Sequence, residues 1–235
     1  MSELKELASK EVLTREDLIR ILSVTESSDV EIVREIANAI RETTVGNKVY
    51  YRGLIEFSNL CVNDCDYCGI RKGNGAVKRY TLSHQEIVDA ALWCAQQGYG
   101  SVVLQSGERT DVSFIDFVEN VVKEIKARST SLAMPHGLGI TLCVGEQTPK
   151  TYERFFAAGA HRYLLRIETT NPQLFGKIHP PSQSLENRTE CLRTLKKIGF
   201  QVGTGVMIGL PGQTVENLAD DILFFKDLDI DMIGM

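Results

Sequence analysis

Three cysteines stand close together in the stretch CVNDCDYC, which runs from Cys61 to Cys68 with Cys65 between them. A structural zinc ion normally takes four protein ligands, and a ferredoxin-type cluster takes four thiolates, but no fourth thiol follows nearby. Three thiolates closing on three corners of a [4Fe-4S] cube would leave one iron open to a small chelating ligand. Zinc binding and inert thiols are the alternatives for this pattern.

The cysteines directly follow the first of six apolar segments that are predicted to be β-strands. Amphipathic helices are predicted between these segments, beginning near Ser83, Ser113, Thr148, Ser184 and Thr214. Such alternation is typical of parallel βα units and favours a TIM-type (β/α) barrel, truncated here to about six strands. A flavodoxin-like or Rossmann sheet is the alternative, although no glycine-rich turn follows the first strand. The predicted strands span residues 49–58, 101–107, 137–145, 161–169, 200–209 and 230–235.

A helical extension is predicted for residues 1–46, ahead of a partial barrel at residues 47–235. Thr14 and Asp17 form a capping-box pattern at the start of one helix, and SDVEIVREIANAIRETT follows as a second helix. The chain stops inside the sixth predicted strand. Because a full barrel of ~250 residues plus this extension needs more chain, we expect a fragment of a longer protein.

The composition indicates a globular protein, with 43% hydrophobic and 24% charged residues. A net charge of -5 argues against a general nucleic-acid binder, which needs a basic surface. The N-terminus lacks the apolar core of a signal peptide, and no uncharged apolar run approaches the ~20 residues of a membrane span. We therefore expect a cytoplasmic protein with reduced thiols and neither a membrane nor a nucleic-acid partner.

With Tyr67 as its aromatic residue, the motif Cys61-x3-Cys65-x-Tyr67-Cys68 resembles that of the radical S-adenosylmethionine (SAM) enzymes. The resemblance implies a (β/α) barrel with one [4Fe-4S] cluster, held by Cys61, Cys65 and Cys68 as metal ligands and catalytic residues. It also implies that the open iron chelates SAM. An electron from the cluster would then cleave SAM to methionine and a 5′-deoxyadenosyl radical.

Polar residues at the C-terminal ends of the strands are the candidates for SAM binding, because active sites of such barrels lie there. QSGE resembles the family's Gly-Glu turn, which holds the SAM ammonium, and a simple turn is the alternative. Arg166 and Glu168 share one face of a predicted strand, as an internal ion pair or as ligand-binding charges. Arg188 lies in a first helical turn, where a nearby anion such as the SAM carboxylate or Glu186 would offset the helix dipole. GVMIGLPGQT resembles the segment that lies against adenine. The predicted SAM-binding residues are Tyr67, Ser106, Gly107, Glu108, Thr141, Arg166, Glu168, Arg188, Met207 and Ile208.

Within the superfamily, the segments IEFSNLCVNDCDYCGIR, RYLLRIETTNP, ENR and GLPGQT resemble the HydE family of [FeFe]-hydrogenase maturases. This implies a role in H-cluster assembly on a small-molecule or organometallic iron-cysteine substrate. An electron donor such as ferredoxin or flavodoxin and other hydrogenase maturases are the implied partners. The alternatives are a reaction like that of methylornithine synthase or biotin synthase, on a small amino-acid-like or thiol substrate, and a non-catalytic metal-binding assembly module.

Overall fold

The computed structural model describes residues 3–130 and 134–235, which divide into two compact units. The first unit lies within residues 1–50 and 208–227, and the second comprises residues 51–207 and 228–235. The division at residue 46 into a helical extension and a barrel stays a prediction. Within the described residues, no helix is both long enough and apolar enough to cross a membrane.

The first unit is helical. It contains α1 (Glu3–Ala8), α2 (Arg15–Leu22), α3 (Ser27–Thr44) and α9 (Val215–Asp227). The predicted capping box is confirmed, since the Thr14 side chain accepts from the Asp17 amide and the Asp17 carboxylate accepts from the Thr14 amide. Arg15 on α2 makes a two-pronged contact with Asp220 on α9, at 2.6 Å from Nε and 3.0 Å from Nη2.

The second unit is built on one parallel sheet whose strands pair in sequence order. The strands are β1 (Gly53–Ser58), β2 (Ser101–Ser106), β3 (Gly139–Cys143), β4 (Arg162–Leu164), β5 (Gln201–Gly205) and β6 (Met232–Gly234). The sheet is not closed within the described residues, because β1 and β6 form its two ends. The prediction of a parallel α/β fold with about six strands of an incomplete barrel is confirmed.

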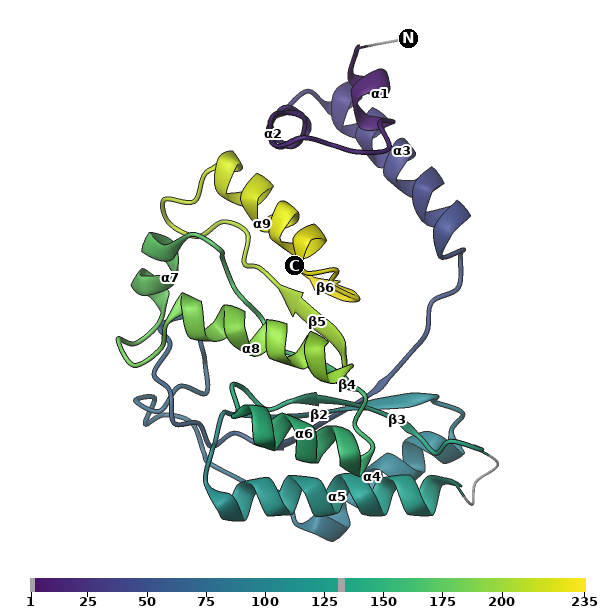
Figure 1. The fold of residues 1–235 in the computed structure, drawn as a ribbon, viewed down its shortest axis with the longest axis vertical. Helices are drawn as coiled ribbons and strands as arrows, with labels where there is room; N and C mark the ends of the chain where they lie inside the picture. Colours follow the sequence, from purple (N-terminus) through teal and green to yellow (C-terminus); the bar gives the residue numbers. More distant parts are fainter. Residues whose placement is uncertain (1–2, 131–133) are drawn as a thin grey trace. The chain divides into compact units, whose positions relative to one another are not determined.

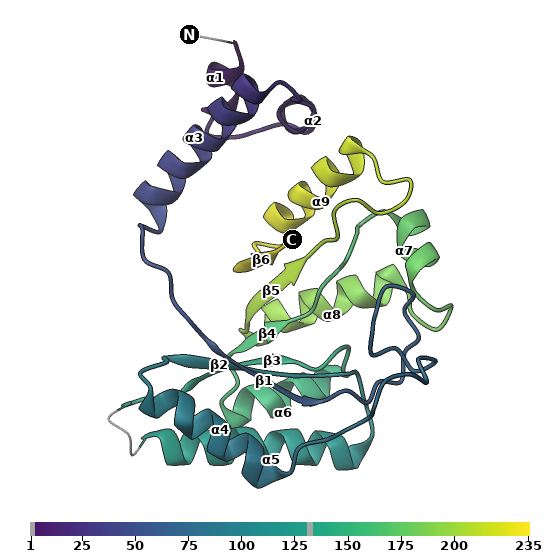
Figure 2. The same cartoon turned by 180° about the vertical axis from the view of Figure 1, so that it is seen from behind.

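Helices connect these strands in the right order for βα units. They are α4 (His84–Gln96), α5 (Val112–Thr130), α6 (Pro149–Ala158), α7 (Pro172–Ile178) and α8 (Leu185–Ile198). Figure 1 shows α4, α5 and α6 along one side of β1 to β3, and Figure 2 shows the same arrangement from behind. The buried core between helices and sheet is apolar. Its fully buried side chains include Ile87, Leu104, Ile125, Leu142, Tyr152, Tyr163 and Leu192.

The fourth strand is shorter than the predicted segment 161–169, because β4 ends at Leu164. Further along the chain, Glu168 has a φ of 64°, a left-handed conformation that is unusual for a residue other than glycine. Beyond Leu164, an isolated bridge between Glu168 and Val206 and backbone hydrogen bonds from the Leu165 and Glu168 amides to β5 continue the pairing. Arg166 and Glu168 therefore lie beyond the C-terminal end of β4 rather than within the strand, and their side chains still lie together as an ion pair.

Candidate functional site

A pocket of about 340 Å³ opens at the C-terminal ends of the strands in the second unit. The loop after β1 forms one wall, and the ends of β2, β3 and β4 form the other. Most of the residues predicted from the sequence meet here. The predicted residues that line it are Cys61, Cys65, Tyr67, Cys68, Ser106, Gly107, Glu108, Arg166, Glu168 and Arg188.

The cysteine loop, residues 59–82 between β1 and α4, is anchored by backbone hydrogen bonds to distant parts of the chain. The Val62 amide donates to the Glu108 carbonyl at 3.0 Å, and the Asp66 amide donates to the Ile178 carbonyl at 3.0 Å. These contacts fix the loop against the turn after β2 and against the end of α7. The three thiols are thereby held in front of the strand ends.

Arg79 fastens the far half of the cysteine loop. Its Nη1 donates to the carbonyls of Asn59 at 2.6 Å and Ile70 at 2.8 Å. Its Nη2 donates to the carbonyls of Arg71 at 2.6 Å and Asn74 at 3.2 Å. A planar guanidinium can serve such a fork of acceptors, which a lysine ammonium cannot match. Arg79 therefore holds this loop together through four backbone carbonyl groups.

Replacing Arg79 by methionine is expected to loosen the loop and to speed the loss of bound iron several-fold. Each hydrogen bond from a charged donor contributes about 1.5–3 kcal/mol, so several lost bonds cannot be offset by packing alone. Iron retention during anaerobic gel filtration measures the effect. Lys78→Met, at an exposed neighbouring residue, is the matched control. Equal iron loss from the two variants would contradict the assigned role of Arg79.

The three thiols fit a cluster better than a single ion. Cys65 is 8% exposed, and its burial raises the pKa of its thiol to about 11, with further raising by Cys61 and Cys68. All three cysteines line the same pocket. Yet no three His, Cys, Asp or Glu side chains in the described part of the chain could share one metal ion. A [4Fe-4S] cubane takes one cysteine per iron, so three thiolates can hold it, whereas a structural zinc ion normally takes four protein ligands.

Close backbone contact joins the turn after β2 to the cysteine loop, and glycine makes it possible. A Cβ on Gly107 would lie 2.3 Å from the Leu60 carbonyl oxygen and 2.7 Å from Cys61 Cβ. Gly145 has a φ of +78°, and a Cβ there would lie 2.3 Å from Glu108 Cγ. These two positions have no room for a side chain.

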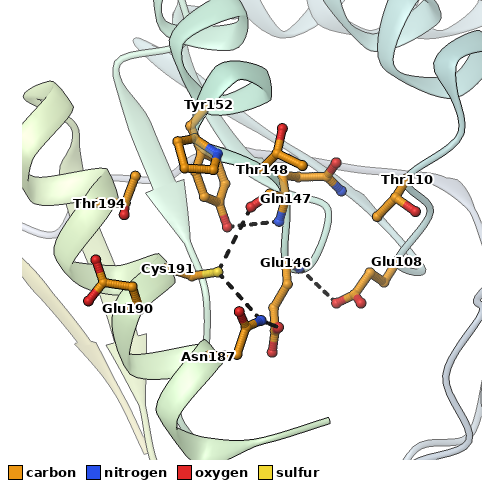
Figure 3. Close-up of a pocket in the computed structure, with 11 residues that line it drawn as sticks. Glu108, Thr110, Glu146, Gln147, Thr148, Tyr152, Asn187, Glu190, Cys191 and Thr194 are labelled. Atoms are coloured by element: carbon orange, nitrogen blue, oxygen red, sulfur yellow. Dashed lines mark hydrogen bonds between the residues drawn. The ribbon is translucent and has the colours of Figure 1, made fainter. Parts of the chain in front are cut away.

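The Glu108 carboxylate ties two loops together at the edge of the pocket. Its Oε1 accepts from Asn63 Nδ2 at 2.8 Å. Its Oε2 accepts from the Glu146 amide at 2.7 Å, as Figure 3 shows. Burial raises the pKa of Glu108, while these two hydrogen bonds act to lower it. Both oxygens of the Glu108 carboxylate therefore already have hydrogen-bond partners within the protein.

Arg188 stands in the first turn of α8, whose N-cap Ser184 accepts from the Asn187 amide at 3.0 Å. Its side chain pairs with Glu146, and its Nη1 donates to the Arg166 carbonyl at 2.7 Å. Burial alone would lower the pKa of Arg188, but the charge and hydrogen bond of Glu146 outweigh it and the pKa is raised. Glu146, rather than the nearby Glu186 considered from the sequence, is therefore the anion that offsets the unfavourable helix dipole at Arg188.

Glu146 also accepts from the Asn187 side chain, at the border of a second pocket of about 510 Å³ shown in Figure 3. The two pockets share Glu108 as a common wall. Glu146 and Asn63 were not predicted as site residues. Their partners lie 42 and 45 positions away along the chain, so local spacing carried no signal for either.

Arg166 and Glu168 form an ion pair at the pocket wall, with Nε 3.1 Å from Oε2. Arg166 Nη2 also donates to the Val206 carbonyl at 2.8 Å. Burial raises the pKa of Glu168, and Arg166 counteracts this effect. The internal pairing considered from the sequence is thus present. A left-handed non-glycine residue costs of order 1–3 kcal/mol and is often found at functional sites, which agrees with a ligand-binding role for Glu168.

Tyr67 is held by a buried histidine that the sequence analysis did not select. His179 Nδ1 lies 3.0 Å from the Phe175 carbonyl, which can only accept, so Nδ1 carries the hydrogen. His179 Nε2 is then the acceptor for the Tyr67 hydroxyl, at 3.2 Å. Burial lowers the pKa of His179 to about 4, so the ring is neutral near pH 7. The helix α7, which supplies Phe175, was not predicted either.

Three predicted residues do not line the pocket. Thr141 lies on β3 two residues before Cys143, which does line it, and its buried Oγ1 has no hydrogen-bond partner among the described residues. The Met207 amide donates to the Glu168 carbonyl at 2.9 Å. Ile208 belongs to the first unit and is 62% exposed.

An incomplete (β/α) barrel of six strands, with three cysteines in the loop after the first strand, is typical of one class of protein. The sequence profile of the Radical SAM superfamily matches residues 55–225, and the chain belongs to this superfamily, whose members use a [4Fe-4S] cluster and SAM. The chain is 43% identical over 234 residues to the [FeFe] hydrogenase maturase subunit HydE of Thermotoga maritima. It is 26% identical over 221 residues to 3-methylornithine synthase of Methanosarcina acetivorans.

These matches cover 99% and 94% of this chain but only 64% and 61% of the two relatives. The crystal structure of methylornithine synthase has a TM-score of 0.84 at 26% identity, covering 98% of this chain and 66% of that one. The crystal structure of HydG, an [FeFe]-hydrogenase maturase, has a TM-score of 0.82 at 22% identity, covering 96% and 50%. At that identity the likeness to HydG supports the fold alone.

Proposed function

We propose that this chain carries the SAM-cleaving site of a HydE-like maturase that acts in assembly of the [FeFe]-hydrogenase H-cluster. The observation that carries the proposal is the meeting of three cysteines, a buried arginine and a strained glutamate around one pocket. The 43% identity to HydE across nearly the whole chain supports this particular member of the superfamily.

The residues have distinct proposed roles. Cys61, Cys65 and Cys68 hold the cluster, which when bound supplies the electron that cleaves the sulfur–C5′ bond of SAM. Glu168 and Arg188 bind the charged end of SAM, helped by the backbone of Ser106, Gly107 and Glu108. Tyr67, Arg166, Thr141 and Met207 complete the proposed set of cofactor-binding residues.

The substrate and partners belong to the same proposal. HydE-like function implies a small iron-cysteine complex as substrate, an electron donor such as ferredoxin or flavodoxin, and cooperation with other hydrogenase maturases. All six cysteines are free thiols, as expected in the reducing cytoplasm where we place this protein.

A methylornithine-synthase-like reaction is the second candidate, because that enzyme's structure superposes with a TM-score of 0.84. Both candidates share the cofactor site and differ in substrate. The lower identity of 26% to methylornithine synthase favours the HydE-like reaction.

Anaerobic reconstitution followed by chemical reduction with SAM tests the shared part of the proposal. We expect methionine and 5′-deoxyadenosine to form in equal amounts from the wild-type chain. Adding an iron-cysteine complex then separates the two candidates, because only the HydE-like reaction should give a higher yield with it. A reconstituted cluster that neither binds nor cleaves SAM would instead favour a non-catalytic assembly module.

A further inference from the structure

Among the three cysteines, Cys65 lies in the most enclosed surroundings. Cys65 is buried, whereas Cys61 and Cys68 are partly exposed. The Asn63 backbone amide donates to Cys61 Sγ at 3.4 Å, a contact that every residue type could supply. Cys65 Sγ instead lies 3.5 Å from the side-chain amide of Gln183.

The Gln183 side chain comes from a loop that is fixed on both sides. The backbone N–H of Gln183 donates to the Pro180 carbonyl at 2.9 Å, and the next residue, Ser184, is the N-cap of α8. Gln183 lines the same pocket as the cysteines. The turn and the start of α8 therefore position the side-chain amide of Gln183 at the Cys65 sulfur, although the two residues are 118 positions apart in the sequence.

The direction of this hydrogen bond depends on the state of the sulfur. A free Cys65 thiol donates to Gln183 Oε1, as the structure has it. A cysteine ligated to iron is a thiolate and can only accept, and a half-turn of the amide then presents Nε2 as the donor.

The Tyr67 hydroxyl has a hydrogen-bond partner other than the Cys65 sulfur. A hydroxyl has one hydrogen, and the neutral His179 ring accepts it at 3.2 Å. Gln183 is the residue whose side-chain amide lies at the Cys65 sulfur, at 3.5 Å.

We propose that Gln183 is a positioning residue that donates a hydrogen bond to the Cys65 sulfur of the cluster-loaded protein and thereby raises the reduction potential of the cluster. The reduced cluster carries one more negative charge than the oxidised one. A donor at its sulfur stabilises the reduced form more. The inference rests on the proposed function, because it requires the cluster to be present.

The test is an EPR-monitored redox titration of the reconstituted chain without SAM. Gln183→Met removes the donor at similar length, and we expect a more negative midpoint potential than in the wild type. Gln183→Glu places a negative charge beside the sulfur, and we expect a larger shift in the same direction. Gln105→Met is the matched control, since Gln105 lines the same pocket but its Nε2 contacts Glu56 at 3.3 Å. Its midpoint should equal that of the wild type.

Iron content is measured in each sample, so that two failures remain distinct. A wild-type chain that assembles no cluster would refute the proposed function. A wild-type chain with a cluster, and Gln183 variants with the wild-type midpoint, would overturn the role of Gln183 alone. Loss of iron from both Gln183 variants would also overturn it, because the contact would then hold the cluster rather than set its potential.

Discussion

Replacing Gly107 by alanine is expected to reduce bound iron from about four per chain to less than one after reconstitution. The added Cβ would lie 2.3 Å from the Leu60 carbonyl oxygen and 2.7 Å from Cys61 Cβ, distances that real Cβ atoms do not show. Neither neighbour can move away freely. Leu60 presents backbone, and Cys61 belongs to the anchored cysteine loop. The strain would be relieved by displacing Cys61 from the cluster position.

Gly69→Ala is the matched control, since Gly69 follows Cys68 directly and a Cβ there would meet nothing within 4 Å. Both variants add one methyl group beside a cluster ligand, and only one of them has no room for it. Iron and sulfide content and the visible absorbance of the cluster measure the outcome. If the Gly107 variant kept its full iron content, the assigned packing between the turn after β2 and the cysteine loop would be incorrect.

Arg188→Met is expected to destabilise the cluster-free chain by about 3–5 kcal/mol, because it leaves a buried carboxylate without its cation. Arg188 is 5% exposed and Glu146 is 9% exposed, so solvent cannot replace the lost partner. Replacing both members by apolar residues is often close to neutral. The double variant Arg188→Met/Glu146→Leu should therefore be more stable than Arg188→Met alone.

Anaerobic urea unfolding of the cluster-free protein measures these differences without interference from the cofactor. Arg193→Met on the same helix is the control, because its pair with Glu190 spans 3.8 Å and both side chains are more than half exposed. We expect that variant to stay within about 0.5 kcal/mol of the wild type. Equal destabilisation by Arg188→Met and Arg193→Met would mean that the buried pair with Glu146 is not formed in solution.

The sequence predicted the features that short, contiguous patterns encode. The three cysteines and Tyr67 fall within eight residues, so their spacing alone indicated three ligands on one loop. The alternation of strands and helices predicted the parallel order of the sheet, which neighbouring βα units largely determine. Both kinds of signal require only local chain geometry.

The supporting contacts of the site could not be predicted, because they join residues from separate loops. Glu146 resembled any acid after a strand until the fold placed Arg188 against it. His179 and Gln183 stand in a loop whose position depends on α7 and α8. The left-handed backbone at Glu168 carried no signal in the sequence either, because glutamate rarely adopts that conformation.

The most direct measurement of the central claim is the iron stoichiometry and Mössbauer spectrum of the anaerobically reconstituted chain, with and without SAM. We expect about four irons per chain as one cubane, with a single iron site whose signal changes when SAM is added. Alanine at Cys61, Cys65 or Cys68 should remove the cluster, whereas alanine at the buried Cys94 should not. A single tightly bound zinc ion, or unchanged iron in all three cysteine variants, would contradict a cluster held at three corners.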